Sequence, residues 1–307
     1  MQIETIRLWP DRDDVELTTF LNKADPFLKN NVPRPAVIVC PGGAYATCDR
    51  HSFEGDPVAM GFAMDGYQAF VLEYSVTSRA PDGKTLYPAM LLDYGKAILT
   101  IREHAEEWNV DPAKISILGF SAGGHLCGTI ATQWQNGVLS EAFGVPSEVF
   151  KPLCVMLIYP VADFVQQEQF RKKPSEMPMS TINMNRAWFG QEEPGDEALA
   201  EASPARNVTK DCPPVFLTAA RDDDLVDATC SLNMAMALQS VGVPYELHMY
   251  EYGDHGFAQG RNLTEPWRGD KAYTAAAWVD AAKAFLLHQH APETARFEEN
   301  PFAQLLP

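Results

Sequence analysis

The chain alternates short apolar runs, rich in β-branched residues, with longer segments of helical hydrophobic spacing. This alternation is typical of a mostly parallel β-sheet whose faces are covered by helices. It predicts eight strands, at 3–8, 15–21, 36–40, 67–74, 114–120, 153–159, 214–220 and 245–250. Helices are predicted between them, at 54–65, 88–108, 122–134, 226–241 and 271–289. The dipeptide Asp111-Pro112 predicts a turn before the fifth strand.

One segment, 163–205, breaks this rhythm because it is polar and contains several Met and Pro residues. It is too long for a plain connection inside a compact domain, and such excursions usually carry function. We interpret it as a cap or lid insertion within a single domain spanning 1–307, with loops near Trp267 as a further pocket wall. A disordered surface loop is the alternative, although Trp188 and Phe189 favour packing.

The charge balance narrows the possible partners. The 41 acidic and 24 basic residues leave a formal net charge of −17, which disfavours nucleic acids and anionic membranes and favours a neutral or cationic small molecule. The first residues are charged, and no segment approaches the roughly 20 apolar residues that span a bilayer, so a cytoplasmic location is expected. The six cysteines form no CxxC pair, which predicts buried thiols rather than a metal site.

The motif Gly119-Phe120-Ser121-Ala122-Gly123 lies between a predicted strand and a predicted helix. A nucleophile on such a sharp turn needs small neighbours, because the flanking elements approach one another closely. The positive end of the helix then faces the reacting oxygen, so the N–H of Ala122 is expected to stabilise an oxyanion. A glycine-rich turn without chemistry is the alternative.

A second glycine-containing loop, Pro41-Gly42-Gly43-Ala44-Tyr45, directly follows the strand at 36–40. Hydrolases that transfer acyl groups use a loop at this position to supply further oxyanion donors. We expect Gly43 and Ala44 to donate their N–H groups and Gly42 to shape the turn, which together with Ala122 defines an oxyanion hole. An ordinary turn is the alternative.

His255 is the best candidate for the general base. It follows the last predicted strand in a glycine-flanked loop, which agrees with the chain order of serine, acid and histidine in hydrolases of this type. The other histidines are on predicted helices, inside a strand, before the serine or near the C-terminus: His104, His125, His248, His51, His288 and His290. His125 lies one helical turn after Ser121 and is expected to be a packed structural residue.

The acid that orients this histidine is expected after the strand at 214–220. The turn there offers four carboxylates, and spacing alone does not choose among Asp222, Asp223, Asp224 and Asp227. The remaining carboxylates are expected to cap the following helix. Asp163 is a weaker candidate.

The motifs PGGAY, YPAMLLDYGKAI, DPAKISILGFSAGGHL and GDHGF occur in the same order in a known group of enzymes. The chain resembles the esterase and lipase branch of the α/β-hydrolases, in particular bacterial acetylesterases such as acetylxylan esterases. The resemblance implies an eight-stranded sheet, no cofactor, and Ser121, Asp223 and His255 as the catalytic triad. Asp223 is singled out because the family's aspartate stands two residues before a hydrophobic-Val pair.

The resemblance also implies a substrate class: short-chain acyl esters, above all acetyl esters of sugars or xylo-oligosaccharides. Without an export signal, imported short oligosaccharides or other small esters are the expected substrates. Two alternatives remain open. The same triad serves amides in peptidases and aryl formamidases, and a hydrolase scaffold can also serve as a non-catalytic binding protein.

Overall fold

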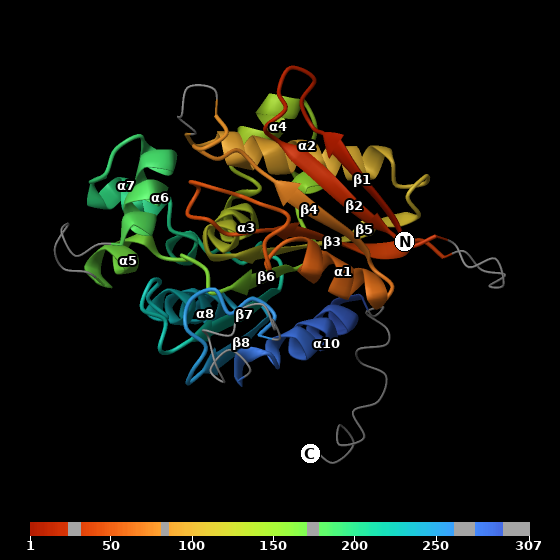
Figure 1. The fold of residues 1–307 in the computed structure, drawn as a ribbon. Helices are drawn as coiled ribbons and strands as arrows, with labels where there is room; N and C mark the ends of the chain where they lie inside the picture. Colours follow the sequence, from red (N-terminus) through yellow and green to blue (C-terminus); the bar gives the residue numbers. More distant parts are fainter. Residues whose placement is uncertain (24–31, 81–85, 171–177, 261–273, 291–307) are drawn as a thin grey trace, which may run out of the picture.

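The computed structural model describes residues 1–23, 32–80, 86–170, 178–260 and 274–290. Its centre is one eight-stranded sheet with the order β1-β2-β4-β3-β5-β6-β7-β8 (Figure 1). β1 and β2 pair antiparallel, as do β2 and β4, and all other neighbours are parallel. The strands are Gln2–Arg7, Glu16–Leu21, Arg34–Cys40, Gln68–Glu73, Val110–Phe120, Val155–Ile158, Val215–Ala220 and Tyr245–Tyr250. The predicted eight-stranded, mostly parallel sheet is confirmed.

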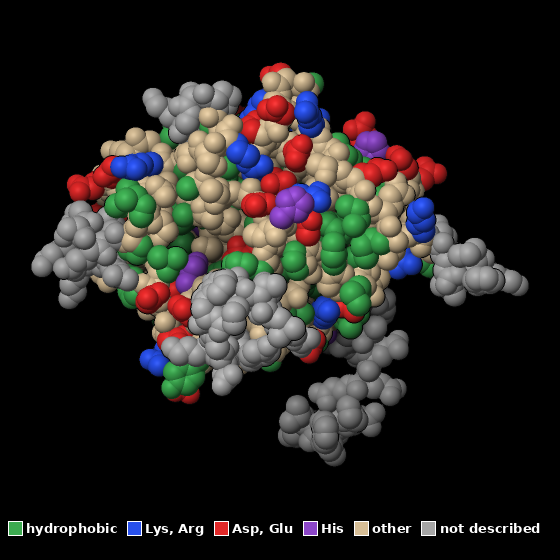
Figure 2. Space-filling view, viewed as in Figure 1, with side chains coloured by type: hydrophobic (Ala, Val, Ile, Leu, Met, Phe, Trp, Pro, Cys, Tyr) green, Lys and Arg blue, Asp and Glu red, His purple; other side chains and the backbone are tan. Residues whose placement is uncertain are grey.

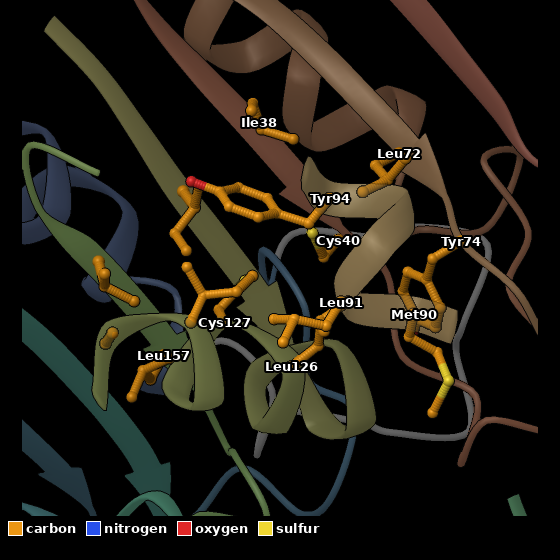
Figure 3. Close-up of a cluster of buried hydrophobic side chains, with 14 of the residues drawn as sticks. Ile38, Cys40, Leu72, Tyr74, Met90, Leu91, Tyr94, Leu126, Cys127 and Leu157 are labelled. Carbon is orange, nitrogen blue, oxygen red and sulfur yellow. The ribbon is translucent and has the colours of Figure 1, made fainter. Parts of the chain in front are cut away.

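The two faces of the sheet build two separate hydrophobic cores. Successive side chains of a strand point to opposite faces, and the apolar run in β3 therefore divides between both cores. Ile38 and Cys40 pack toward α2 (Ala89–Glu103) and α3 (Ser121–Gln133), where Tyr94, Leu91, Leu126 and Cys127 fill the space (Figure 3). Val37 and Val39 belong to the second core, with side chains of α1 (Asp56–Met64) and α10 (Trp278–His290). Strands buried on both faces explain why their sequences are continuously apolar.

The predicted helices are present, most of them with shorter bounds, whereas α3 has the predicted length and begins one residue earlier. The stretch 226–241 forms α8 (Thr229–Val241). The helix predicted at 271–289 overlaps α10, which ends one residue later, and 271–273 lie outside the described residues. A short helix, α4 (Val138–Phe143), precedes β6. Within the described ranges, no helix is long and apolar enough to cross a membrane.

The described part of the segment 163–205 contains three short α-helices, which lie together at the left of Figure 1. They are α5 (Phe164–Phe170), α6 (Met179–Phe189) and α7 (Asp196–Glu201). Trp188 is buried and packs edge-on against His125 of α3, with ring centroids 4.6 Å apart. In its described part the segment is therefore packed rather than an extended surface loop.

The turn predicted at Asp111-Pro112 is wrong, because both residues lie inside β5. The pairing of β3 with β5 shifts there: Arg34 pairs with Val110, but Ala36 pairs with Ile115. The extra residues are accommodated as an irregularity within the strand rather than as a turn before it. The predicted burial of the cysteine thiols is confirmed, since all six are buried and none forms a disulfide.

Candidate active site

The candidate residues meet at the carboxyl ends of the parallel strands. β3 and β5 are neighbours in the sheet, but the chain leaves them in opposite directions, toward β4 and β6 respectively. Such a topological switch point leaves a crevice between the loops that follow the two strands. The loop at 41–45 follows β3, and Ser121 follows β5, so the fold brings these two segments together.

Ser121 is the first residue of α3 and has a φ of 49°, a left-handed conformation that is costly for a residue with a side chain. The flanking glycines make this turn possible. A Cβ at Gly119 would lie 2.2 Å from the carbonyl oxygen of Gly123, and a Cβ at Gly123 would lie 2.1 Å from that of Cys40. The turn therefore packs closely against the end of β3. The N–H of Ala122 lies in the first turn of α3, where it has no intrahelical acceptor.

The loop after β3 is held from both sides. The Tyr74 hydroxyl donates to the carbonyl oxygen of Pro41 (2.6 Å), and the N–H of Gly42 donates to Glu54 Oε2 (2.7 Å). The Gly42 N–H therefore already has a side-chain acceptor. Of the described residues, none accepts a hydrogen bond from the N–H of Gly43 or Ala44. Both residues line the same cavity as Ser121.

His255 lies in the loop that follows β8. Gly253 is required there, since a Cβ on it would lie 2.8 Å from Cβ of Ala220 at the end of β7. Asp222 Oδ1 accepts hydrogen bonds from the N–H groups of Gly253 and Asp254, each at 2.9 Å. The loop that carries His255 is thus fastened to the turn after β7.

His255 contacts both other members of the expected triad. Its Nδ1 lies 2.7 Å from Asp223 Oδ2, and its Nε2 lies 3.0 Å from Ser121 Oγ. A carboxylate only accepts, so Nδ1 carries the hydrogen and the lone pair of neutral Nε2 faces the serine hydroxyl. The Asp223 side chain is 1% exposed and that of His255 is 14% exposed, which places the pair largely out of water.

The carboxylates of the turn after β7, residues 221–227, have different contacts. Asp223 also accepts hydrogen bonds from the N–H groups of Leu225 and Val226, so its rotamer is fixed. Asp227 caps α8 through the N–H of Thr229, and Asp224 lines the cavity at Ser121. The expectation of helix capping thus holds for Asp227.

Asp163 belongs to a separate network. It is buried and accepts hydrogen bonds from Arg206 (2.8 Å), Asn233 (2.9 Å) and the N–H of Gln166 (3.2 Å). Burial opposes ionisation, but these donors outweigh it and lower the pKa of Asp163. This carboxylate connects α5, α8 and the segment before β7, and the structure does not place it with the triad residues.

His125 is packed in the core, as the sequence predicts. It is fully buried, and desolvation lowers its pKa to about 4. Its Nε2 lies 2.8 Å from the carbonyl oxygen of Ala202, and its Nδ1 lies 2.8 Å from the Tyr45 hydroxyl. His125 thereby joins α3 to the loop after β3 and to the end of the insertion.

A cavity of about 500 Å³ opens beside Ser121 and His255. Its wall includes Ser180 of α6, so the insertion contributes to it, as expected for the 163–205 segment. Trp267 lies outside the described residues. In the described part of the chain, four carboxylates line the cavity: Asp49, Glu54, Asp224 and Asp254. The surface shown in Figure 2 also carries many acidic side chains, and an anionic ligand is therefore disfavoured.

Sequence reasoning missed Glu54 and Tyr159. Glu54 falls in the stretch assigned to a helix but precedes α1, and Tyr159 is the last residue of an apolar run. Their one sequence signal is polarity at the end of predicted elements, which is too weak to single them out. Within the described ranges, no group of three or more His, Cys, Asp or Glu side chains could hold a metal ion.

The sheet order, with its antiparallel second strand, and a serine on a strained turn after the fifth strand define the class of α/β-hydrolases. The sequence profile of the BD-FAE family matches residues 26–238. The chain belongs to this family, in the esterase and lipase branch of the class.

Relatives with curated descriptions include a Butyrivibrio fibrisolvens endo-1,4-beta-xylanase B, which is 30% identical over 77% of this chain. A Xylanibacter ruminicola acetylxylan esterase is 30% identical over 76% of this chain. The chain spans only 35% and 43%, respectively, of the length of these two proteins.

Solved structures resemble the chain over nearly its whole length. The acetyl ester-xyloside bifunctional hydrolase of Caldicellulosiruptor lactoaceticus is 28% identical, with a TM-score of 0.68 over 91% of this chain and 96% of that one. The carboxylesterase Cest-2923 of Lactobacillus plantarum shares the fold, with a TM-score of 0.76 over 94% of this chain and 98% of that one, at 24% identity.

Proposed function

We propose that this chain is a serine carboxylesterase that hydrolyses short-chain acyl esters, with Ser121 as nucleophile, His255 as general base and Asp223 as its orienting acid. The observation that carries the proposal is the position of the His255 ring, which is in hydrogen-bond contact with Asp223 on one side and Ser121 on the other. Nucleophile, base and orienter within such reach are the requirement for an activated serine.

In the proposed reaction, Nε2 of His255 takes the hydroxyl proton as Ser121 Oγ forms a bond to the ester carbonyl carbon. The N–H groups of Gly43, Ala44 and Ala122 stabilise the oxyanion of the tetrahedral intermediate. The bond to the alcohol oxygen then breaks, and His255 returns its proton to that oxygen. Water attacks the acyl-enzyme in the same way, which releases the carboxylic acid and restores Ser121. Asp223 stabilises the imidazolium in both steps.

Two observations support a short acyl group on a neutral, polar alcohol. Among the described residues, only a few apolar side chains line the cavity, such as Phe53 and Leu225, whereas a long acyl chain needs an extended apolar wall. Two relatives are an acetylxylan esterase and an acetyl ester-xyloside bifunctional hydrolase. Their names support acetylated xylo-oligosaccharides as the proposed substrate.

The test compares wild type with Ser121→Ala on chromogenic esters from acetyl to octanoyl, on acetylated xylo-oligosaccharides, and on peptide and formamide substrates. We expect acetyl esters to be cleaved fastest and Ser121→Ala to lose roughly 10⁶-fold in turnover. A preference for amides would replace the ester assignment. Failure of a fluorophosphonate probe to label Ser121 in the wild type would instead indicate a non-catalytic protein.

A further inference from the structure

The Glu54 carboxylate joins two segments on which the proposed reaction depends. Oε2 accepts a hydrogen bond from the N–H of Gly42 (2.7 Å), and Oε1 accepts one from the Tyr159 hydroxyl (2.7 Å). Glu54 is only 8% exposed and forms part of the cavity wall at Ser121. A carboxylate in this position keeps its rotamer because both oxygens have directed donors.

Tyr159 connects Glu54 to the loop after β8 that carries His255 and Ala258, here called the histidine loop. Its hydroxyl oxygen accepts a hydrogen bond from the N–H of Ala258 (3.1 Å), three residues after His255. Its ring packs edge-on against the His255 imidazole, with centroids 5.0 Å apart. The hydrogen bonds therefore run from Ala258 through Tyr159 to Glu54, where they meet the bond from Gly42.

The backbone at Tyr159 shows that this arrangement is imposed by its surroundings. The residue has a φ of 38°, a strained conformation that is rare for a bulky residue. The Tyr159 ring packs against the rings of Phe120 and Phe257. The Tyr159 N–H donates a hydrogen bond to the carbonyl oxygen of Thr218. Strain of this kind clusters at functional sites, where it fixes the direction of a side chain.

We propose that Glu54 is a positioning residue. It fixes the loop after β3, residues 41–45, at Gly42 relative to the histidine loop at Ala258. The inference rests on the proposed function, because it assigns Glu54 a role in that same reaction. A carboxylate serves both donors, whereas a glutamine that presents its oxygen to Gly42 turns its NH₂ group toward Tyr159, and the bond from the Tyr159 hydroxyl to Oε1 is lost. An alanine loses both bonds.

The experiment measures the rate at which a fluorophosphonate probe labels Ser121, together with kcat and KM for a chromogenic acetyl ester. Glu54→Gln should slow labelling and kcat by about 10- to 100-fold with KM changed less than about threefold, since misplacement of reacting groups lowers the rate of the chemical step. Glu54→Ala should be slower than Glu54→Gln. Tyr159→Phe, which retains the Gly42 bond, should be affected less than Glu54→Ala.

Asp93→Asn is the matched control. Asp93 is fully buried and, like Glu54, accepts hydrogen bonds from a backbone N–H and an aromatic side chain, those of Ser75 (2.8 Å) and Trp9 (2.7 Å). It does not line the cavity. This variant should lose thermal stability, but its folded fraction should label Ser121 at the wild-type rate.

A folded Glu54→Gln variant that labels within twofold of wild type would overturn the proposal, as would an equal loss in Asp93→Asn. The labelling rate also separates this result from the test of the proposed function. If wild type is labelled but hydrolyses no ester, the ester assignment fails while the effect of Glu54 on Ser121 is still measured. If wild type is not labelled, both proposals fail.

Discussion

The Tyr45 hydroxyl donates a hydrogen bond to Nδ1 of His125 across 2.8 Å. The direction follows from the other ring nitrogen, since Nε2 faces the carbonyl oxygen of Ala202, which only accepts. Nε2 therefore carries the hydrogen of the neutral ring, and Nδ1 accepts. A protonated ring would bring a second hydrogen against the tyrosine hydroxyl in a fully buried site.

This arrangement predicts a pH dependence of stability. Desolvation lowers the pKa of His125 from 6.5 to about 4 in the folded state, so between these values the unfolded chain binds a proton that the folded chain does not. Stability is lost as the pH falls through this window, by up to roughly 3 kcal/mol. Urea unfolding at several pH values should show a smaller loss in His125→Gln than in wild type, whereas exposed His51→Gln should behave as wild type. Parallel curves for all three proteins would contradict the prediction.

Asp223→Asn is expected to retain the fold and lose activity. The amide oxygen of asparagine can still accept from the N–H groups of Leu225 and Val226, but its NH₂ group faces Nδ1 of His255 and favours the wrong tautomer. The expected loss in kcat is about 10⁴-fold. Asp227→Asn, four residues along the same turn, is the control and should keep near wild-type kcat. Steady-state kinetics of both variants distinguish the two carboxylates, and the reverse order of activities would refute the assignment of Asp223.

Asp222 should affect the rate without touching the reacting groups. Its Oδ1 holds the N–H groups of Gly253 and Asp254, so Asp222→Ala releases the loop that positions His255. We expect kcat to fall about tenfold or more, because small displacements of a catalytic group are costly. Asp222→Asn retains the accepting oxygen and should restore most of the rate. Equal kcat values for the alanine variant and wild type would show that the loop does not need this contact.

Gly123→Ala is expected to prevent correct folding or to remove activity. The added Cβ would lie 2.1 Å from the carbonyl oxygen of Cys40 and 2.4 Å from that of Pro41, both of which are backbone atoms that a rotamer change cannot move. The free energy of unfolding should fall by more than about 3 kcal/mol. Gly195→Ala is the comparison, since nothing lies within 4 Å of its Cβ and its φ is −70°, so its effect should stay within about 1 kcal/mol. Thermal unfolding of both proteins checks the difference.

The sheet and the serine turn were predictable because their signals are local. A parallel strand is buried on both faces and therefore reads as one apolar run, and a sharp turn after β5 requires glycines at 119 and 123. The Asp111-Pro112 turn was mispredicted because a proline can also sit at a strand irregularity, which depends on the pairing with β3.

The residues around the triad were less accessible to sequence reasoning. The choice among Asp222, Asp223 and Asp224 depends on how a tight turn directs three adjacent side chains, and spacing carries no information about that. Glu54 and Tyr159 are 105 residues apart and meet only through the order of the strands. A buried contact of this kind leaves no periodic pattern in either segment.

The contact between Tyr45 and Trp188 limits how the substrate selectivity of the protein can be redesigned. Tyr45 lies next to Ala44 in the loop beside the serine, and its ring centroid is 5.7 Å from that of Trp188 in α6. An exchange of the 163–205 segment for that of a relative, made to redesign selectivity, would also remove a ring that supports this loop. Chimaeras that exchange this segment but keep tryptophan at position 188 should therefore retain turnover.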